Sequence, residues 1–157
     1  MVFNGVSGNC LEFSDARLTS SNNYEVEMLM SNFAYRQTTY ANPIFDTRPM
    51  GTNGNYWYLY YTSNTPAPFK VTLGSNNDTS TITTPGISQY PVKIVFRVVN
   101  NITSLYINDV LQPTTIPGVP FSGLSCKIGK NAFVGSAPVP YLQCNMYYFR
   151  INRLLFP

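Results

Sequence analysis

Histidine is absent from this chain of 157 residues, and charged residues are scarce. Without an imidazole, the chain cannot form a Ser-His-Asp triad, a Cys-His pair or a histidine-ligated zinc site. Charged side chains make up 11% of the residues, against a typical share of about 25%. The ten basic residues are scattered and form no run, so we expect no nucleic-acid partner.

Cysteine, metal-binding and targeting signals are also sparse. The three cysteines, Cys10, Cys126 and Cys144, form no C-x-x-C motif, and an odd number does not make a disulfide framework. The seven acidic residues do not cluster into a calcium-binding loop, so we expect neither a metal nor a cofactor. The N-terminus lacks the pattern of a signal peptide, and no apolar run is long enough to span a membrane.

The main pattern in the sequence is a period-2 alternation of apolar and polar residues. Twelve prolines and ten glycines interrupt any helical pattern. In segment 23–31, Val26, Met28 and Met30 share one face and the two glutamates the other. Segment 91–100 places Val92, Ile94, Phe96 and Val98 on one face in the same way. Such alternation is typical of strands that cover a core on one side.

We therefore predict a single all-β domain over 1–157, with almost no helix, folded as a two-sheet antiparallel β-sandwich of jelly-roll type. Asn100-Asn101 and Asn108-Asp109 suit tight turns between strands. Segment 112–124, rich in proline and glycine, is expected to be a loop. The predicted strands are 2–6, 9–14, 23–31, 41–48, 55–62, 68–73, 79–84, 91–100, 102–108, 110–114, 124–129 and 142–152.

Several short motifs resemble the laminin-G-like branch of the concanavalin A-like lectin/glucanase fold. The block YPVKIVFRVVNNITSLYINDVL (90–111) is similar to its long strand and following hairpin, with Asp109 where the family usually has glycine. VFNGVSGNCLEF (2–13), YEVEMLM (24–30), KIG (127–129) and MYYFRINRLLF (146–156) resemble other strands of that fold in the same order. The YYFRI segment, with the terminal LLFP, also looks like laminin-G-like domains of tailed-phage virion proteins.

The resemblance implies a non-catalytic binding module that recognises a glycan or a host cell-surface structure, on a virion or an extracellular surface. One alternative is a structural virion or surface module whose exposed aromatic residues make protein–protein contacts. A glycoside hydrolase is a further alternative, but the E-x-D-x-x-E motif of glucanases on this fold is missing. Its nearest substitute is the pair Glu25 and Glu27, spaced by about 6.6 Å along a strand.

The candidate ligand site is an aromatic run with its neighbouring loops. Tyr56, Tyr58 and Tyr60 alternate along one face, where phenol rings could stack on sugars, although aromatic residues favour strands in any case. The segments before this run supply further candidate residues, which either hydrogen-bond a sugar or serve only to form turns. These residues are Asp46, Arg48, Asn53, Asn55, Tyr35, Arg36 and Tyr40. Weak single-site binding favours a homo-oligomer. The phage resemblance favours a trimer.

Overall fold

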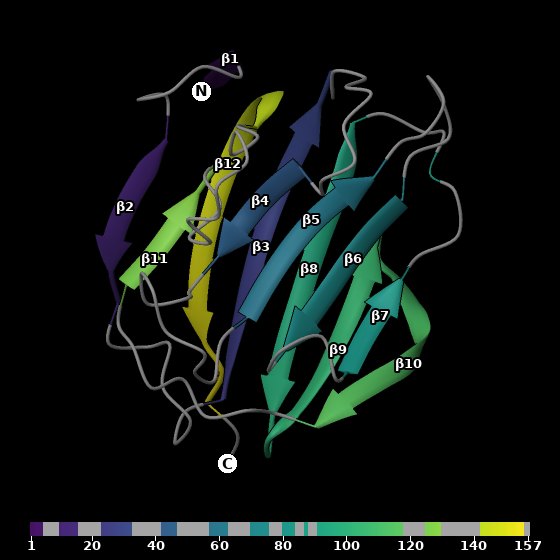
Figure 1. Cartoon of the computed structure of the whole chain (residues 1–157). Helices are drawn as coiled ribbons and strands as arrows, with labels where there is room; N and C mark the ends of the chain where they lie inside the picture. The colour runs from purple at the N-terminus through teal and green to yellow at the C-terminus, as the bar shows by residue number, and fades with distance from the viewer. Residues whose placement is uncertain are drawn as a thin grey trace, which may run out of the picture.

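The computed structural model describes residues 1–4, 10–15, 23–32, 42–46, 57–62, 70–75, 80–83, 87, 91–117, 125–129 and 142–155. Within these ranges every regular element is a β-strand, and the strands form two six-stranded antiparallel sheets that face each other (Figure 1). The prediction of an all-β sandwich is confirmed. Among the described residues, no helix could cross a membrane.

The two sheets interleave strands from distant parts of the chain. Sheet A has the order β1 (Val2–Asn4), β12 (Gln143–Arg153), β3 (Tyr24–Ser31), β8 (Val92–Val99), β9 (Ile102–Ile107), β10 (Val110–Pro117). Sheet B has the order β2 (Leu11–Ser14), β11 (Ser125–Ile128), β4 (Asn42–Asp46), β5 (Trp57–Thr62), β6 (Lys70–Ser75), β7 (Ser80–Thr83).

The core lies between the sheets and follows the predicted alternation. The inward residues of β3 and β8 are buried, and the register pairs Val26 with Phe96 and Met28 with Ile94. From sheet B, the Phe45 ring lies 5.5 Å from that of Phe96 and 5.8 Å from that of Phe149, centroid to centroid. Burial of apolar side chains from both sheets is the main force that holds them together.

Two asparagine-containing turns connect the strands of the meander from β8 to β10. Asn100 and Asn101 have φ angles of 48° and 61°, and Asn108 and Asp109 have φ angles of 49° and 66°. Such left-handed conformations suit two-residue hairpins, and asparagine and aspartate tolerate them better than other non-glycine residues. Both turn predictions are confirmed.

The predicted end of the strand at 114, within a segment 112–124 that was expected to be a loop, is wrong. β10 continues to Pro117, through Pro113, with a register shift between Leu111 and Thr115. β10 is the last strand of sheet A, so a proline there removes no hydrogen bond to a further strand. The other described ends of the predicted strands fall within two residues of those observed.

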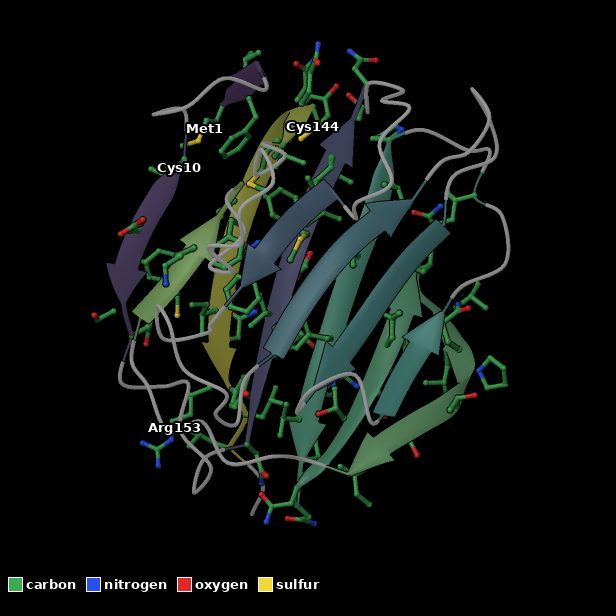
Figure 2. All side chains as sticks on the ribbon, viewed as in Figure 1. Met1, Cys10, Cys144 and Arg153 are labelled. Atoms are coloured by element: carbon green, nitrogen blue, oxygen red, sulfur yellow. The ribbon has the colours of Figure 1, made fainter. Side chains whose placement is uncertain are left out.

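The three cysteines are free thiols. Cys126 and Cys144 are buried in the core, whereas Cys10 is half-buried. Cys10 comes just before β2, and Cys144 lies on β12 (Figure 2). Desolvation by burial raises the pKa of both the Cys126 and the Cys144 thiol to about 12. These two thiols behave as small apolar side chains.

Candidate functional site

Three of the sequence-predicted ligand residues lie on neighbouring strands of sheet B. Asp46 ends β4, and Tyr58 and Tyr60 belong to β5. The register places Asp46 directly opposite Tyr58, and Pro43 opposite Tyr60. The remaining predicted residues lie outside the described ranges: Tyr35, Arg36, Tyr40, Arg48, Asn53, Asn55 and Tyr56.

The pairing of Asp46 with Tyr58 is part of a row of polar or small residues that crosses all six strands. The row, which we call the polar row, consists of the register positions Glu12, Lys127, Asp46, Tyr58, Gly74 and Thr81. The adjacent row is apolar throughout and consists of Leu11, Ile128, Phe45, Leu59, Leu73 and Ile82. Because Phe45 and Ile128 belong to the core and neighbouring strand positions alternate between faces, the polar row belongs to the outer face of sheet B.

Lys127 is one of four members of the polar row that the sequence analysis did not select; the others are Glu12, Gly74 and Thr81. Its neighbours on β11, Cys126 and Ile128, are buried in the core, so Lys127 points to the opposite face. Even there it is only 2% exposed. The register places an acidic residue on each side of it, Glu12 on β2 and Asp46 on β4. A buried ammonium group requires such oppositely charged or hydrogen-bonding neighbours.

Gly74 leaves one position of the polar row without a side chain. It lies directly opposite Tyr58 on β6, and Thr81 follows on the edge strand β7. The row therefore combines carboxylates, a phenol and a hydroxyl with a position that adds no bulk beside the phenol. These are the groups that accept and donate hydrogen bonds to hydroxyl-rich ligands, and an aromatic ring adds a stacking surface.

The outer face of sheet A carries a different set of polar groups, which are paired with one another. Arg97 donates from Nε and Nη2 to Oε2 of Glu25, at 2.9 and 2.6 Å. Its guanidinium group also lies 5.1 Å from the centroid of the Tyr106 ring. The hydrogen bond to Glu25 raises the pKa of Arg97. Glu25 is thus held by a cation from the neighbouring strand.

Glu27 is the centre of a second cluster on the same face. The Tyr148 hydroxyl donates to its Oε1, which also lies 3.7 Å from Nη2 of Arg150 and 4.0 Å from Nζ of Lys93. Burial, then the hydrogen bond to Glu27, raises the pKa of the Tyr148 phenol. Lys93 also donates to Asp109 at 2.7 Å, which raises the pKa of Lys93.

The two glutamates lie on the outer face of sheet A, yet they are not open to solvent. Their side chains are only 13% exposed because the long side chains of neighbouring strands lie over them. Val95, between the glutamates and the next strand, is 5% exposed for the same reason. The outer face of sheet A is therefore a closed network in which both carboxylates are held by cations.

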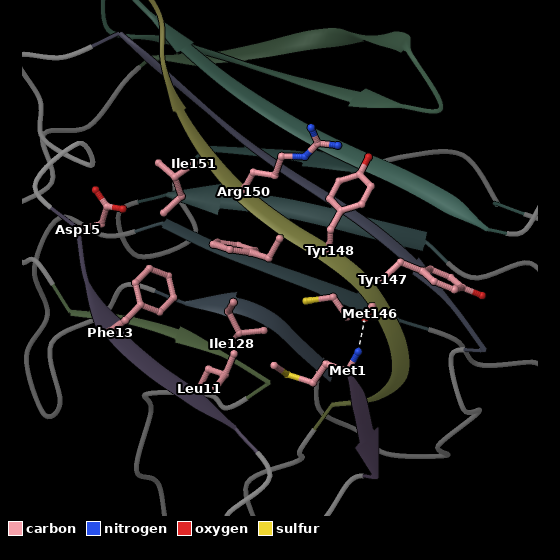
Figure 3. A pocket seen from close by; sticks show the side chains of 11 residues that line it. Met1, Leu11, Phe13, Asp15, Ile128, Met146, Tyr147, Tyr148, Arg150 and Ile151 are labelled. Carbon is pink, nitrogen blue, oxygen red and sulfur yellow. Dashed lines mark hydrogen bonds between the residues drawn. The ribbon is translucent and has the colours of Figure 1, made fainter.

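A hollow of about 680 Å³ opens at the edge of the sandwich between β2 and β12 (Figure 3). Its described lining is mainly apolar and includes Leu11, Phe13, Ile128 and Met146. Six consecutive residues of β12, 146–151, line it, although their side chains alternate between the two faces of the sheet. The hollow therefore reaches the backbone edge of β12. None of the predicted ligand residues is in its described lining.

In the described part of the chain, no three acidic or cysteine side chains gather into a possible metal site. Asp15 lines the hollow at the sandwich edge, and Asp109 is paired with Lys93 on the other sheet. Oxygen ligands for a hard cation such as calcium need to converge on one point.

Comparison with known proteins identifies the fold but no sequence family. No family model matches the chain, and no curated protein matches it. Domains LG4-5 of the mouse laminin α1 chain superimpose with a TM-score of 0.62 and 9% identity, over 95% of this chain and 39% of that one. The present chain therefore spans well under half of that laminin fragment.

Two further structures share the fold. The CBM40 domain of the Ruminococcus gnavus IT-sialidase, bound to α2,6-sialyllactose, has a TM-score of 0.62 and 11% identity, over 100% of this chain and 91% of that one. The enzymatically active domain of tailspike protein 2 from bacteriophage CBA120 has a TM-score of 0.58 and 12% identity, over 99% of this chain and 29% of that one. These likenesses show that the chain shares the two-sheet antiparallel β-sandwich fold of these structures.

Proposed function

We propose that this protein is a non-catalytic glycan-binding module whose ligand lies on the outer face of sheet B, at Asp46 and Tyr58 of the polar row. The observation that carries the proposal is the register that sets Asp46 opposite Tyr58, with Gly74 on the other side of Tyr58. A carboxylate beside a phenol offers a sugar both hydrogen-bond acceptors and a stacking ring. The glycine adds no side chain at its position in the row.

The fold supports this proposal at the level of the binding class. The CBM40 domain is a carbohydrate-binding domain of nearly the same extent as this chain, and its structure holds a sialylated sugar. A shared fold does not decide function, because the same sandwich carries lectins, enzymes and structural modules. The proposal therefore depends on the polar row and not on the superposition.

We propose no catalytic activity because the carboxylate pair that the sequence suggested, Glu25 and Glu27, is engaged in ion pairs. A glycosidase needs one carboxylic acid and one carboxylate that face a bound sugar. Glu25 and Glu27 instead lie beneath Arg97 and Arg150 and are 13% exposed. Neither is presented to a substrate.

The biological setting that we propose is a virion or an extracellular surface, with a host cell-surface receptor as the source of the glycan. The tailspike similarity and the phage-like YYFRI segment support a phage virion protein. In that setting we propose a homo-oligomer, with a trimer favoured, because several linked weak sites raise avidity by about 10²- to 10⁴-fold. A structural virion module is the competing function, in which the same residues would form subunit contacts.

A glycan array, run beside a measurement of molar mass, tests the proposed function. We expect binding by the full chain and its loss in Tyr58→Ala, with unchanged mass. Tyr147→Ala is the matched control, because Tyr147 is 60% exposed and lies on β12 in the other sheet. Equal losses in both variants, or no binding by the unmodified chain, would refute the proposal. Loss of the oligomer in Tyr58→Ala would favour the structural module.

A further inference from the structure

We propose that the hollow between β2 and β12 is a second binding site, which takes a small uncharged aromatic molecule. The hollow opens between the two sheets, whereas the polar row belongs to the outer face of sheet B, so this proposal does not depend on glycan binding. Two observations carry it: inner-face side chains that stay partly exposed at this edge, and a series of aromatic rings that ends on the hollow.

The inner face of β2 is only partly covered. Leu11 and Phe13 lie opposite Ile128 and Cys126 in the register, and both of these β11 residues are buried in the core. Leu11 is nevertheless 39% exposed, and Phe13 is half-buried. Inner-face side chains of a sandwich normally pack against the other sheet. At this edge, the space beside them is the hollow of about 680 Å³.

A series of phenylalanine rings leads from the middle of the core to the hollow. The Phe45 ring contacts the Phe96 ring on one side and the Phe149 ring on the other. The Phe149 ring in turn lies edge-to-face against the Phe13 ring, with 5.7 Å between centroids. Phe96 and Phe45 are fully buried, whereas Phe149 and Phe13 are only partly buried. The last two rings line the hollow, where Phe13 is labelled in Figure 3, and they have surface left for a further ring.

This lining favours an aromatic ring over a saturated group of the same size. Aromatic rings gain energy beyond area burial when they pack edge-to-face or offset, as Phe149 and Phe13 already do. The hollow is also lined by Met146, whose thioether makes favourable contacts with rings. Its volume falls within the range of about 300–1,000 Å³ that is typical of small-molecule sites.

The polar side chains of the lining indicate an uncharged ligand. Asp15 and Arg150 both line the hollow, so a ligand of either sign would meet a like charge there. A charged group would also lose hydration against the apolar part of the lining. Tyr147 and Tyr148 line the hollow as well, and phenol oxygens are able to hydrogen-bond one polar substituent of the ligand.

The test titrates the full ¹⁵N-labelled chain with benzyl alcohol and with cyclohexylmethanol, which share one skeleton but differ in the aromatic ring. We expect benzyl alcohol to bind at least about threefold more tightly, because only its ring gains the aromatic contacts. The largest amide shifts should fall at Phe13, Ile128 and Phe149. Equal affinities, no saturable binding of benzyl alcohol, or shifts confined to the polar row would overturn the proposal. Neither probe is a glycan, so such a failure would leave the proposed glycan site standing.

A variant that fills the hollow tests the location of the site. Leu11 is partly exposed on the edge strand β2, so Leu11→Trp places a larger side chain in the hollow without displacing the core. We expect this variant to bind benzyl alcohol at least about tenfold more weakly. Ile102→Trp is the matched control, because Ile102 is 51% exposed and lies on β9, and it should bind as the unmodified chain does. Unchanged affinity in Leu11→Trp, or equal losses in both variants, would overturn the proposal.

Phe13→Leu tests the role of the ring without filling the hollow. Leucine keeps most of the apolar volume, and Phe13 is only half-buried on an edge strand, so this variant should fold, which circular dichroism verifies. We expect it to reduce the preference for benzyl alcohol over cyclohexylmethanol by about twofold or more. An unchanged preference would show that the aromatic series does not select the ligand.

Discussion

At the scale of single residues, the buried Lys127 is the least expected feature of the molecule. Long charged side chains on the outer face of a sheet normally reach water. Lys127 does not, and acidic residues lie on both sides of it in the register. Removing one member of a buried charged group leaves the others without compensation, which costs more than removing an exposed ion.

Replacement of Lys127 should therefore be much more costly than replacement of an exposed lysine. We expect Lys127→Ala to lower the free energy of unfolding by about 3–5 kcal/mol. Lys93→Ala, which removes two partly exposed ion pairs, should lower it by less than about 1 kcal/mol. Urea denaturation of both variants measures the difference. Equal losses would mean that the charge of Lys127 is not held by its neighbours.

Alkaline pH should destabilise the protein through its buried thiols. In the unfolded chain a thiol ionises with a pKa of about 8.5, whereas in the fold burial raises the pKa of Cys126 and Cys144 to about 12. Between these values the folded state holds more protons than the unfolded state, so stability falls as the pH rises. Below the lower value the full stability is present.

Urea denaturation at a series of pH values above neutral measures this effect. The double variant Cys126→Ala/Cys144→Ala should lose less stability on going from neutral to alkaline pH than the unmodified chain does. Cys10→Ala is the control, since Cys10 is only half-buried, and it should retain the full alkaline loss. A double variant with an unchanged pH profile would contradict the assignment.

At the scale of elements, β8 and its two neighbours show how closely local pattern and final structure agree. The apolar residues that alternate along 91–100 form the buried face of β8. Asn100-Asn101 forms the tight turn that the asparagine pair predicted. Phe96 lies at the centre of that face, fully buried and in contact with Phe45 of the other sheet. Its removal would open a cavity between the sheets.

We expect Phe96→Ala to cost about 3–5 kcal/mol of unfolding free energy. Val99→Ala, on the half-buried outer face of the same strand, should cost less than about 1 kcal/mol. Denaturant unfolding followed by tryptophan fluorescence compares the two. Comparable losses would mean that the inner and outer faces of β8 are exchanged, since a slip of one residue does so.

What the sequence could not reveal concerns contacts between distant strands. The alternation shows that Glu12 and Lys127 point away from the core, but only the fold brings β2 beside β11 and β11 beside β4. The polar row is therefore a product of sheet order, which no local pattern encodes. The extension of β10 beyond 114 to Pro117 was missed for a related reason: proline disfavours a central strand, yet it is tolerated in β10 because β10 is an edge strand.

The candidate site was predictable in part. Asp46 and Tyr58 were both selected from the sequence, as an acid and an aromatic residue of one segment, and the register sets them opposite each other. Gly74 and Lys127 were not selected, because a lone glycine in a strand and a lone lysine between apolar residues are ordinary features in isolation. Their importance arises from the positions beside them.

At the scale of the whole molecule, the sandwich presents two chemically different outer faces. The outer face of sheet A is a closed network of ion pairs, whereas the described strands of sheet B carry the polar row. We expect a glycan ligand to use the second face. Sedimentation equilibrium should give the mass of a trimer of the 17.6-kDa chain, and a monomer at all concentrations would contradict the proposed homo-oligomer.

The central claim is the location of the ligand, and a nuclear magnetic resonance titration of the uniformly ¹⁵N-labelled protein tests it most directly. Amide shifts are followed as the strongest ligand from the glycan array is added. The account predicts the largest shifts at Asp46, Tyr58 and Gly74, with Lys93, Arg97 and Arg150 unaffected. Shifts confined to β3, β8 and β12 would place the ligand on the outer face of sheet A and contradict the account.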